Sequence, residues 1–416
     1  MRKRALKWAS LTLLGPLAWA GVSTPADAAD ESGLAVSTST ASMASLVEVS
    51  QSVAGARREE RSANLSTLAA ASPEDCLVAD GDETLTVVRL AGDNRYETAV
   101  CVSYWSWPDH DDEEAEFPAQ AVVLARGDLF PDALAGGPLA AHAEGPLLLT
   151  PPSALHPSVA TEIERVLAPG GLVYLLGGTS ALSAGVEQQV QSAGYQTKRV
   201  SGSNRFLTSI AIAEELPITS NFFFATGQNF PDALAAGNAA AALTIAAKYD
   251  DDPDTLPFAV LLTADRQMPA TIADFAWDRG LSFGVWTLLT AGGQADAAAL
   301  AEFGEINLAP GGRFVGANRF ATATMIAEGI YTDESGELIS DAVGLATGTN
   351  FPDALAASSH LAWWGEPLLL TATSLTTPTG DFLSDHAGEG AFLEAFGGTG
   401  AISQSVLDAA ESAFRP

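Results

Sequence analysis

Arginine and aspartate recur at matching positions in three parts of the chain, and both residue types can recognise a ligand. Each arginine ends an Asn-Arg pair, and its planar guanidinium suits a phosphate, a carboxylate or an array of sugar hydroxyls. Each aspartate lies in the sequence Phe-Pro-Asp-Ala-Leu-Ala. The candidate ligand-binding residues of these motifs are Arg95, Asp132, Arg205, Asp232, Arg319 and Asp353. An internal ion pair, such as Arg95 with Asp132, is the alternative interpretation of the arginines, and the sequence does not separate the two.

The aspartate motif also has a structural explanation, because it falls where a predicted strand ends and a predicted helix begins. Gly127 permits a sharp turn, and Pro131 suits the first helical turn, where a missing N–H costs little. Asp132 then places a carboxylate near the amides at the helix start. The small residues that follow would let the helix lie close to its sheet. We expect this structural role for most of the motif, with direct ligand binding by the aspartate as the alternative.

Two further motifs end predicted strands in each copy. One is Pro-Leu-Leu-Leu-Thr at 146–150 and 367–371, with Ala-Val-Leu-Leu-Thr at 259–263, and the other contains a Gly-Gly pair. Ligands bind outside the carboxyl ends of the strands in open parallel sheets, so both motifs are expected on the ligand-binding side. They add the candidates Thr150, Thr263 and Thr371.

Four motifs return in the same order three times, and this defines the organisation of the chain. The first reads VRLAGDNRYETAV, then KRVSGSNRFLTSI, then GRFVGANRFATAT. Short apolar runs alternate with helix-like stretches in each copy, which predicts an α/β domain with a mainly parallel sheet. The predicted repeats span 82–197, 198–311 and 312–416.

The first 81 residues have a different character. A basic start, an apolar run and a small-residue cleavage signal predict a secretory signal peptide at 1–28, and 29–81 is predicted to be a flexible leader rich in Ser, Ala and Thr. No later segment contains 18 consecutive apolar residues, so we expect no integral membrane segment after cleavage. Export permits a disulfide between Cys76 and Cys101, and a buried thiol on a helix is the alternative.

Composition also excludes some functions. The formal net charge of −31 argues against a nucleic-acid partner, because such binding needs Lys and Arg to replace counterions. None of the five histidines recurs at a repeated position, and no Ser-His-Asp set or metal-ligand spacing stands out. We therefore expect no cofactor, no metal and no catalysis. Receptor adhesion through Arg126-Gly127-Asp128 is not expected either, since only the glycine recurs in the other copies.

Together the motifs resemble the type 2 cell wall-binding repeat family over about residues 82–416. The resemblance implies three Rossmann-like modules with approximate threefold symmetry, exported by a Gram-positive bacterium and bound non-covalently to its wall. Repeat two departs from the family pattern, because its Ala-Val-Leu-Leu-Thr lacks the proline. All three repeats depart from it at Asn94, Asn204 and Asn318, where the family usually has Asp. Pro-Leu-Leu-Leu-Thr at 146–150 and 367–371 resembles the family's Pro-Ile-Leu-Leu motif, which is associated with polymer binding. This resemblance adds the candidates Leu147, Leu148, Leu149, Leu368, Leu369 and Leu370.

These observations predict a secreted, non-catalytic protein of the cell wall or cell surface. Its expected partner is a wall polymer, either an anionic or a neutral glycan, bound through the three repeats. A modulator of a cell-wall hydrolase or of another surface protein is the alternative. An enzyme that acts on wall polymer has the least support, because no catalytic set repeats or stands alone.

Overall fold

The computed structural model describes residues 76–81, 84–112, 117–250, 255–283 and 286–416. The predicted signal peptide at 1–28, and all of the predicted leader but its last residues, lie outside this part of the chain. No helix among the described residues combines the length and the apolar character needed to cross a membrane.

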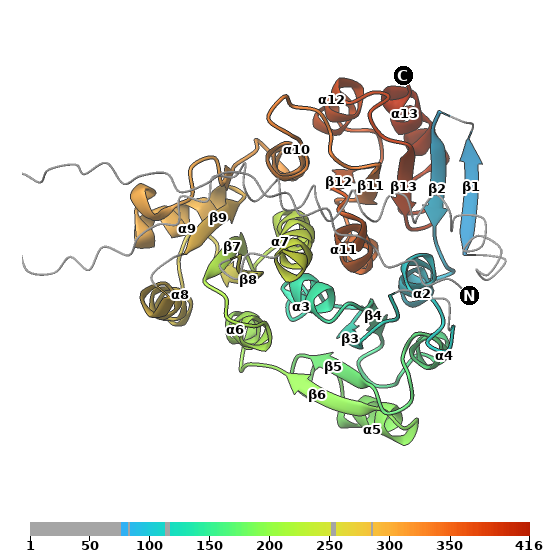
Figure 1. Ribbon diagram of the computed structural model, residues 1–416, viewed down its shortest axis with the longest axis vertical. Helices are drawn as coiled ribbons and strands as arrows, with labels where there is room; N and C mark the ends of the chain where they lie inside the picture. The colour runs from blue at the N-terminus through green and yellow to red at the C-terminus, as the bar shows by residue number, and fades with distance from the viewer. Residues whose placement is uncertain (1–75, 82–83, 113–116, 251–254, 284–285) are drawn as a thin grey trace, which may run out of the picture. The chain divides into compact units, whose positions relative to one another are not determined.

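The first module is a sheet of four parallel strands in the order β4-β3-β5-β6, with helices in the connections (Figure 1). Strands β3 and β4 are nearly continuous apolar runs, as expected for strands that are covered on both faces, whereas the outer strand β6 is polar and partly exposed. The elements are α2 (Arg95–Ser106), which packs on β4, β3 (Ala121–Arg126), α3 (Gly136–His142), β4 (Leu147–Thr150), α4 (Pro157–Val166), β5 (Leu172–Leu176), α5 (Ala184–Ser192) and β6 (Gln196–Val200).

The second module repeats this plan with four parallel strands in the order β10-β9-β7-β8. Its elements are α6 (Arg205–Glu215), β7 (Asn221–Thr226), α7 (Pro231–Tyr249), β8 (Phe258–Thr263), α8 (Ala270–Phe283), β9 (Thr287–Ala291), α9 (Gly293–Phe303), the 3₁₀ turn η1 (Glu305–Asn307) and β10 (Arg313–Phe314).

The third module has five strands in the order β1-β2-β13-β11-β12, of which β1 alone is antiparallel to its neighbour. It combines the two ends of the described chain. The elements are β1 (Leu77–Gly81), β2 (Thr86–Leu90), α10 (Arg319–Ile330), β11 (Ala342–Thr347), α11 (Pro352–Trp364), β12 (Leu368–Thr371), α12 (Thr377–Asp385), β13 (Phe392–Phe396) and α13 (Gln404–Phe414).

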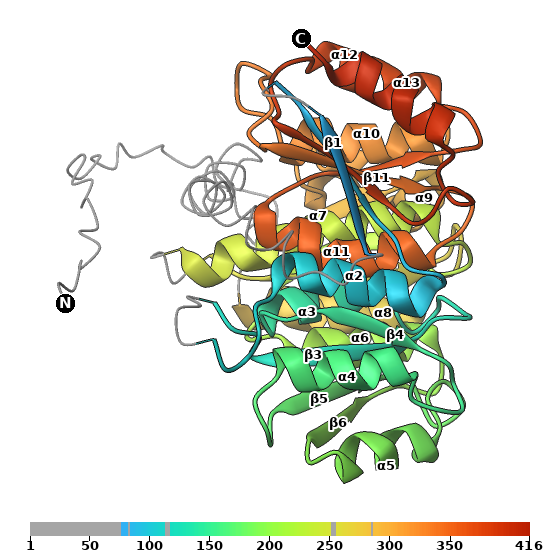
Figure 2. The same cartoon turned by 90° about the vertical axis from the view of Figure 1, so that its right-hand side faces the viewer.

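The sequence repeats and the sheets are out of step by one strand. The first strand of repeat one, β2, pairs with β13 of the third module, where Thr86 lies opposite Phe392 (Figure 1). Figure 2 shows the blue strands from the start of the described chain among the orange and red elements of the third module. In the same way β6 completes the first sheet and β10 completes the second. The sequence predicts each of these strands in the sheet of its own repeat, and the structure places it in a neighbouring sheet. Every sheet is therefore completed by a strand from the next sequence repeat around the molecule.

Three equivalent helices, α3, α7 and α11, pack against one another where the modules meet (Figure 1). The contact is close, because a Cβ on Gly137 of α3 would lie 3.0 Å from the carbonyl oxygen of Gly237 in α7. The small residues after the Pro-Asp motif were expected to bring each helix near its own sheet. At Gly137 they also let one helix approach another.

The expected helix start at the proline holds in two modules. Pro231 and Pro352 begin α7 and α11, whereas residues 131–135 form a turn and α3 begins only at Gly136. Pro138 explains the difference, because it has no N–H to donate to the carbonyl four residues earlier.

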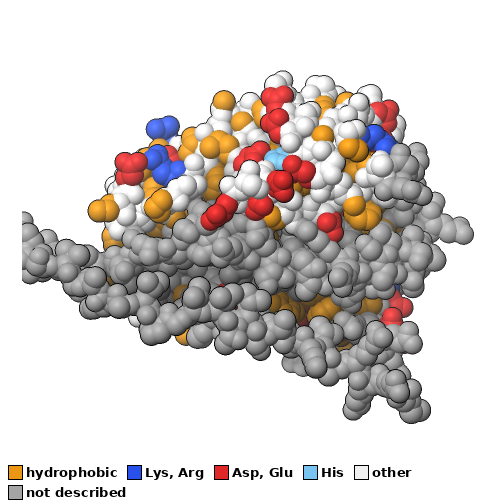
Figure 3. Space-filling view, turned by 45° about the horizontal axis from the view of Figure 1, so that its top comes forward, with side chains coloured by type: hydrophobic (Ala, Val, Ile, Leu, Met, Phe, Trp, Pro, Cys, Tyr) orange, Lys and Arg blue, Asp and Glu red, His pale blue; other side chains and the backbone are white. Residues whose placement is uncertain are grey.

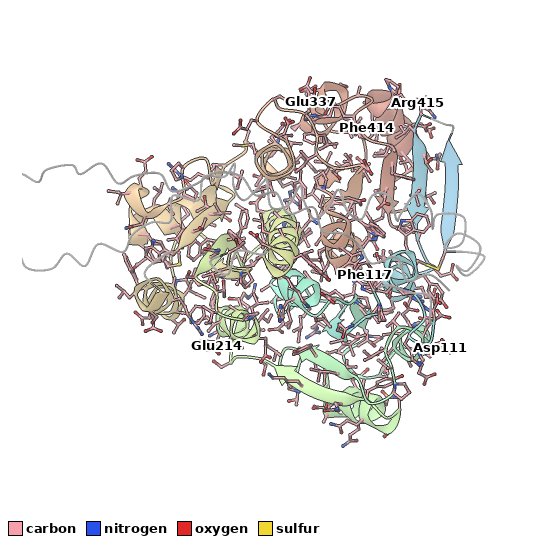
Figure 4. The ribbon with its side chains drawn as sticks, viewed as in Figure 1. Asp111, Phe117, Glu214, Glu337, Phe414 and Arg415 are labelled. Carbon is pink, nitrogen blue, oxygen red and sulfur yellow. A yellow bond between two sulfur atoms is a disulfide. The ribbon has the colours of Figure 1, made fainter. Side chains whose placement is uncertain are left out.

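A disulfide joins Cys76, just before β1, to Cys101 in α2. Figure 4 draws the sulfur–sulfur bond in yellow. The pair closes a loop with a sequence separation of 25 residues, so it ties the start of the described chain to the first helix of repeat one. A buried free thiol, the alternative considered from the sequence, is not what the structure contains.

Candidate functional site

Three phenylalanines meet where the carboxyl ends of the three sheets converge. The ring centroids of Phe130, Phe230 and Phe351 lie 5.6, 5.7 and 5.9 Å apart in the three pairs. Each precedes a Pro-Asp pair, so the Phe-Pro-Asp motif gives the modules a shared aromatic contact about an approximate threefold axis. Such tilted and edge-to-face pairs each add roughly 0.5–1.5 kcal/mol beyond the area they bury.

The loops before these rings carry exposed side chains of varied chemistry. Leu129 is 50% exposed, and residues 228–229 and 349–350 offer amides and a hydroxyl at the equivalent places. We call the surface formed by these rings and loops the central face; it comprises Phe130, Phe230, Phe351 and residues 127–129, 227–229 and 348–350. Phe130 and Phe230 are partly exposed and can stack on a sugar beside the loop amides, which can hydrogen-bond its hydroxyls. Phe351 is only 7% exposed and packs against the other two rings.

The arginines of the Asn-Arg pairs begin α2, α6 and α10 and hold the central face in place. Arg95 Nη1 donates to the Gly127 carbonyl at 2.5 Å, and Arg319 Nη1 donates to that of Gly348 at 2.6 Å. Arg205 makes the same bond with Gly227. The suggested ion pair between Arg95 and Asp132 does not form in the described part of the chain, because a backbone carbonyl takes the guanidinium. Each arginine thus fastens a helix start to the loop after the next strand.

The same guanidiniums also face the preceding module. Arg205 lies 5.9 Å from the ring centre of Phe130, and Arg319 lies 6.0 Å from that of Phe230. These distances lie within cation–π range. Arg205 and Arg319 therefore each link two modules at the central face.

The aspartates of the Pro-Asp motif pack behind the rings against the first glycine of each Gly-Gly pair. A Cβ on Gly177 would lie 2.8 Å from Asp132 Oδ2, and one on Gly397 would lie 2.5 Å from Asp353 Oδ2. Gly292 stands in the same relation to Asp232. All three glycines also have positive φ, between 82° and 101°. Two constraints therefore require glycine at the first position of each Gly-Gly pair: the positive φ of the turn, and the carboxylate that leaves no room for a Cβ.

Burial dominates the electrostatics of two of these aspartates. It raises the pKa of Asp353 to about 6, although the charge of Arg95 works in the opposite direction. Burial also raises the pKa of Asp232, opposed by a hydrogen bond from Thr322 and by the charge of Arg319. In both cases the opposing arginine comes from another sequence repeat, so carboxylate ionisation is coupled to how the repeats pack together.

The second set of repeated arginines, in β2, β6 and β10, is structural as well. Arg89 Nη1 donates to the Gly397 carbonyl and Arg199 Nη1 to that of Gly177, each at 2.9 Å. Arg313 instead makes a two-pronged pair with Asp296, and its hydrogen bond lowers the pKa of that carboxyl.

The asparagines of the first motif cap the helices. Asn94, Asn204 and Asn318 each accept two backbone N–H bonds at the starts of α2, α6 and α10.

The candidates from the third motif lie inside the protein. The six leucines are between 0 and 2% exposed, so their side chains present almost no surface to a polymer. They build edge strands between modules, where Leu147 N–H donates to Ser359 Oγ and Leu368 N–H to Asn238 Oδ1, each at 3.1 Å. The buried hydroxyls of Thr150, Thr263 and Thr371 bond the turns that follow the strands.

The two charged residues of the Arg126-Gly127-Asp128 tripeptide bind each other. Arg126 makes a two-pronged salt bridge to Asp128 at 2.7 and 2.8 Å, and this hydrogen bonding lowers the pKa of the Asp128 carboxyl. Arg126 also donates to the Ser180 carbonyl at 3.2 Å. Both charged groups therefore already have partners within the loop region.

Sequence reasoning missed one group of functional residue types. Ser106 of α2 meets His360 and Glu394 of the third module, although the chain separates Ser106 from His360 by 254 residues. No motif marks them, and none recurs in the other copies. The sequence did contain a signal, because aligning the copies places His360 and Glu394 at positions where another copy has an apolar residue.

Comparisons with known proteins agree with this geometry. The model of the family described as Cell wall binding domain 2 (CWB2) matches residues 89–187, 199–294 and 313–407. The chain is 26% identical over 286 residues to N-acetylmuramoyl-L-alanine amidase LytC of Bacillus subtilis (strain 168), covering 69% of this chain and 50% of the relative. It is 33% identical over 171 residues to the amidase enhancer of the same organism, covering 41% and 23%. The chain therefore spans half or less of each relative's length.

Two solved structures from Clostridium difficile share the fold. Cwp8 matches with a TM-score of 0.64 at 23% identity, covering 79% of this chain and 51% of that one. Cwp6 matches with a TM-score of 0.63 at 22% identity, covering 82% and 51%. The three matched segments, the four repeated motifs and the three joined α/β modules lead to one conclusion: this chain belongs to the cell wall binding domain 2 family and is a cell-wall-binding protein with three copies of its repeat.

Proposed function

We propose that the protein is exported, has no catalytic activity and binds a wall glycan non-covalently through its central face. The observation that carries the proposal is the triangle of Phe130, Phe230 and Phe351. It brings one loop from each module to a single surface, and that surface exists only when all three modules are joined. A polymer that contacts three loops at once gains avidity that no single loop provides.

The absence of catalysis is part of the proposal. It is supported by the chemistry of the repeated polar groups, since Arg95, Arg205 and Arg319 each donate to a backbone carbonyl, and a guanidinium that stays protonated does not act as a general acid or base. Export is supported by the predicted signal peptide at 1–28 and by the Cys76–Cys101 disulfide, which suits an oxidising compartment.

The charge distribution favours a neutral glycan or one bridged by divalent cations. The chain carries a formal net charge of −31, and Figure 3 shows Asp and Glu side chains gathered on a face of the molecule that has few Lys or Arg. Such a surface repels a polyanion at long range. Stacking and hydrogen bonding at the central face need no net positive charge.

A sacculus pulldown tests the proposal. The full mature chain is incubated with purified sacculi, with and without polymer extraction and with and without Ca²⁺, and the bound fraction is measured. A variant with Leu129→Glu, Gln228→Glu and Thr349→Glu adds one charge to each loop of the central face. We expect its affinity for the wall to fall at least about 10-fold, because each charge must be desolvated on stacking.

The matched control adds the same charges to outer helices of the three modules, with Gln188→Glu, Ser282→Glu and Ser405→Glu. These exposed positions lie in α5, α8 and α13, so this variant is expected to bind like the wild type. Equal binding by the two variants would move the site away from the central face. A wild-type protein that stays in the supernatant under every condition would refute wall binding itself.

A second candidate function is modulation of a cell-wall hydrolase. The specific observation in its favour is the 33% identity to the amidase enhancer over 171 residues. Wall turnover by a purified amidase should then rise when the protein is added, and the protein alone should release no soluble wall fragments. An unchanged amidase rate would leave wall binding as the sole proposal.

A further inference from the structure

A buried polar cluster fastens α2 to the third module. His360 Nε2 lies 2.6 Å from Glu394 Oε2, and Ser106 Oγ hydrogen-bonds the other ring nitrogen. Trp105 Nε1 donates to Glu394 Oε1 at 3.1 Å, and Glu366 Oε2 lies 3.9 Å from His360 Nε2. His360, Glu366 and Glu394 are at most 1% exposed. Two carboxyls and one imidazole therefore converge in the interior.

The fold does not require this cluster, as the other two modules show. Counting from the Pro-Asp and Gly-Gly motifs gives the equivalent position in each copy. The equivalents are Leu139 and Ala239 for His360, and Tyr174 and Leu289 for Glu394. Leucine or alanine thus fills the place of the histidine in the same architecture, and leucine that of the glutamate in one copy. The third module has exchanged apolar packing for ionisable groups, a costly exchange unless the groups bind something.

The donor atoms indicate what the cluster can bind. One imidazole nitrogen and two carboxylate oxygens form a ligand set typical of divalent transition-metal sites in proteins, because both groups bind such ions well.

The outer contacts of the cluster suit metal binding. Ser106 holds the Nδ1 of His360 and Trp105 holds the Oε1 of Glu394, which aims Nε2 and Oε2 toward each other. Metal-ligating histidines and carboxylates are oriented in this way by a second shell of hydrogen bonds. Oε2 of Glu366 completes a set of three atoms that lie within 4.8 Å of one another.

A second histidine in the same module provides a contrast. His386 also contacts two glutamates, but Nδ1 bonds Glu389 at 2.7 Å while Nε2 faces Glu328 at 3.3 Å. Because the two ring nitrogens point in different directions, those carboxylates cannot meet at one ion with the imidazole. The His386 group therefore serves as an internal control with similar composition and different geometry.

We propose that His360, Glu366 and Glu394 bind one divalent transition-metal ion of the Zn²⁺ class. With bonds of about 2.0–2.2 Å, shifts of under about 1 Å would bring all three donor atoms around the ion. The imidazole nitrogen disfavours Ca²⁺ and Mg²⁺, which prefer oxygen donors. The ion would strengthen the packing of α2 on α11, next to the contact of Phe117 with Trp363 at 5.8 Å (Figure 4).

Metal analysis of the full mature chain tests the proposal. Because the cluster is buried, the protein is refolded from denaturant with Zn²⁺ or with EDTA, desalted, and its zinc content measured by mass spectrometry. We expect about one ion per chain after refolding with Zn²⁺, and a melting temperature about 5 °C above that of the EDTA sample. Co²⁺ should give a visible absorption spectrum typical of a four-coordinate ion.

Two variants probe the ligands. Glu394→Gln keeps the acceptor for Trp105, and His360→Leu with Glu394→Leu introduces residues that other copies hold at these positions. Both are expected to fold, as checked by circular dichroism, and to retain under about 0.1 ion per chain. His386→Leu is the matched control and should retain the metal.

Three outcomes would overturn the proposal. The first is a wild-type chain that binds no Zn²⁺ and melts at the same temperature in both samples. The second is full metal retention by the folded His360→Leu/Glu394→Leu variant. The third is equal metal loss in His386→Leu. None of these results depends on wall binding.

Discussion

The carboxylate of Asp353 packs directly against the backbone of Gly397, so that a Cβ added to Gly397 would lie only 2.5 Å from Asp353 Oδ2. Asp353 lies in the first turn of α11, and Gly397 follows β13 with φ +101°. Gly397 also receives a hydrogen bond from Arg89 in the chain's second described strand. One contact thus joins the Pro-Asp motif, the Gly-Gly motif and the strand that completes the third sheet.

Gly397→Ala is therefore expected to destabilise the protein. The new Cβ meets Asp353 and the residue must hold a positive φ, so we expect a loss of about 2–4 kcal/mol in the free energy of unfolding. Urea denaturation measures the change. Gly398→Ala is the matched control, because a Cβ there meets nothing within 4 Å, and it should alter stability by under about 1 kcal/mol. Equal effects of the two substitutions would contradict the role of the aspartate.

The raised pKa of Asp353 predicts a pH dependence of stability. Its folded pKa is about 6 against an ordinary 3.8, so between these values the folded state holds a proton that the unfolded state has released. The contribution of this group to the free energy of unfolding should then fall by about 2–3 kcal/mol as the pH rises from about 4 to about 7, and stay level above. Asp353→Asn should remove this slope and be more stable than the wild type at pH 7. A variant with the wild-type slope would contradict the assignment.

Arg319→Ala tests the arginines of the Asn-Arg pairs. It removes the donor to the Gly348 carbonyl at 2.6 Å and the guanidinium over Phe230, for an expected loss of about 1–3 kcal/mol. Thermal unfolding measures it. Arg266 is exposed on the loop after β8, so Arg266→Ala serves as control with a change within about 0.5 kcal/mol. If the Arg319→Ala protein is as stable as this control, the structural role of Arg319 is contradicted and ligand binding is the remaining explanation for the arginine.

Removing the disulfide should weaken the start of the described chain. The bond closes a loop with a sequence separation of 25 residues, and Cys76→Ala with Cys101→Ala is expected to cost about 3 kcal/mol, mainly because the unfolded chain gains freedom. Reducing the wild-type protein should lower its melting temperature equally, while the double variant should not respond to reductant. Unaltered melting in both experiments would mean that the bond adds no stability.

The sequence by itself determined the three-part organisation and the α/β class, because both follow from local patterns. Repeated motifs, apolar strands and turn residues such as Gly127 act over a few neighbouring residues. The disulfide partners were also predictable, since the described chain contains no third cysteine.

Only the tertiary structure decided how the copies fit together. β2 pairs with β13 across some 300 residues of sequence, Arg95 acts on Asp353 of another repeat, and Ser106 meets His360. Local pattern cannot assign an edge strand or an arginine to one of three nearly identical partners, because each offers the same residue types. The choice follows from packing α3, α7 and α11 around one centre, where every module supplies the edge that its neighbour lacks.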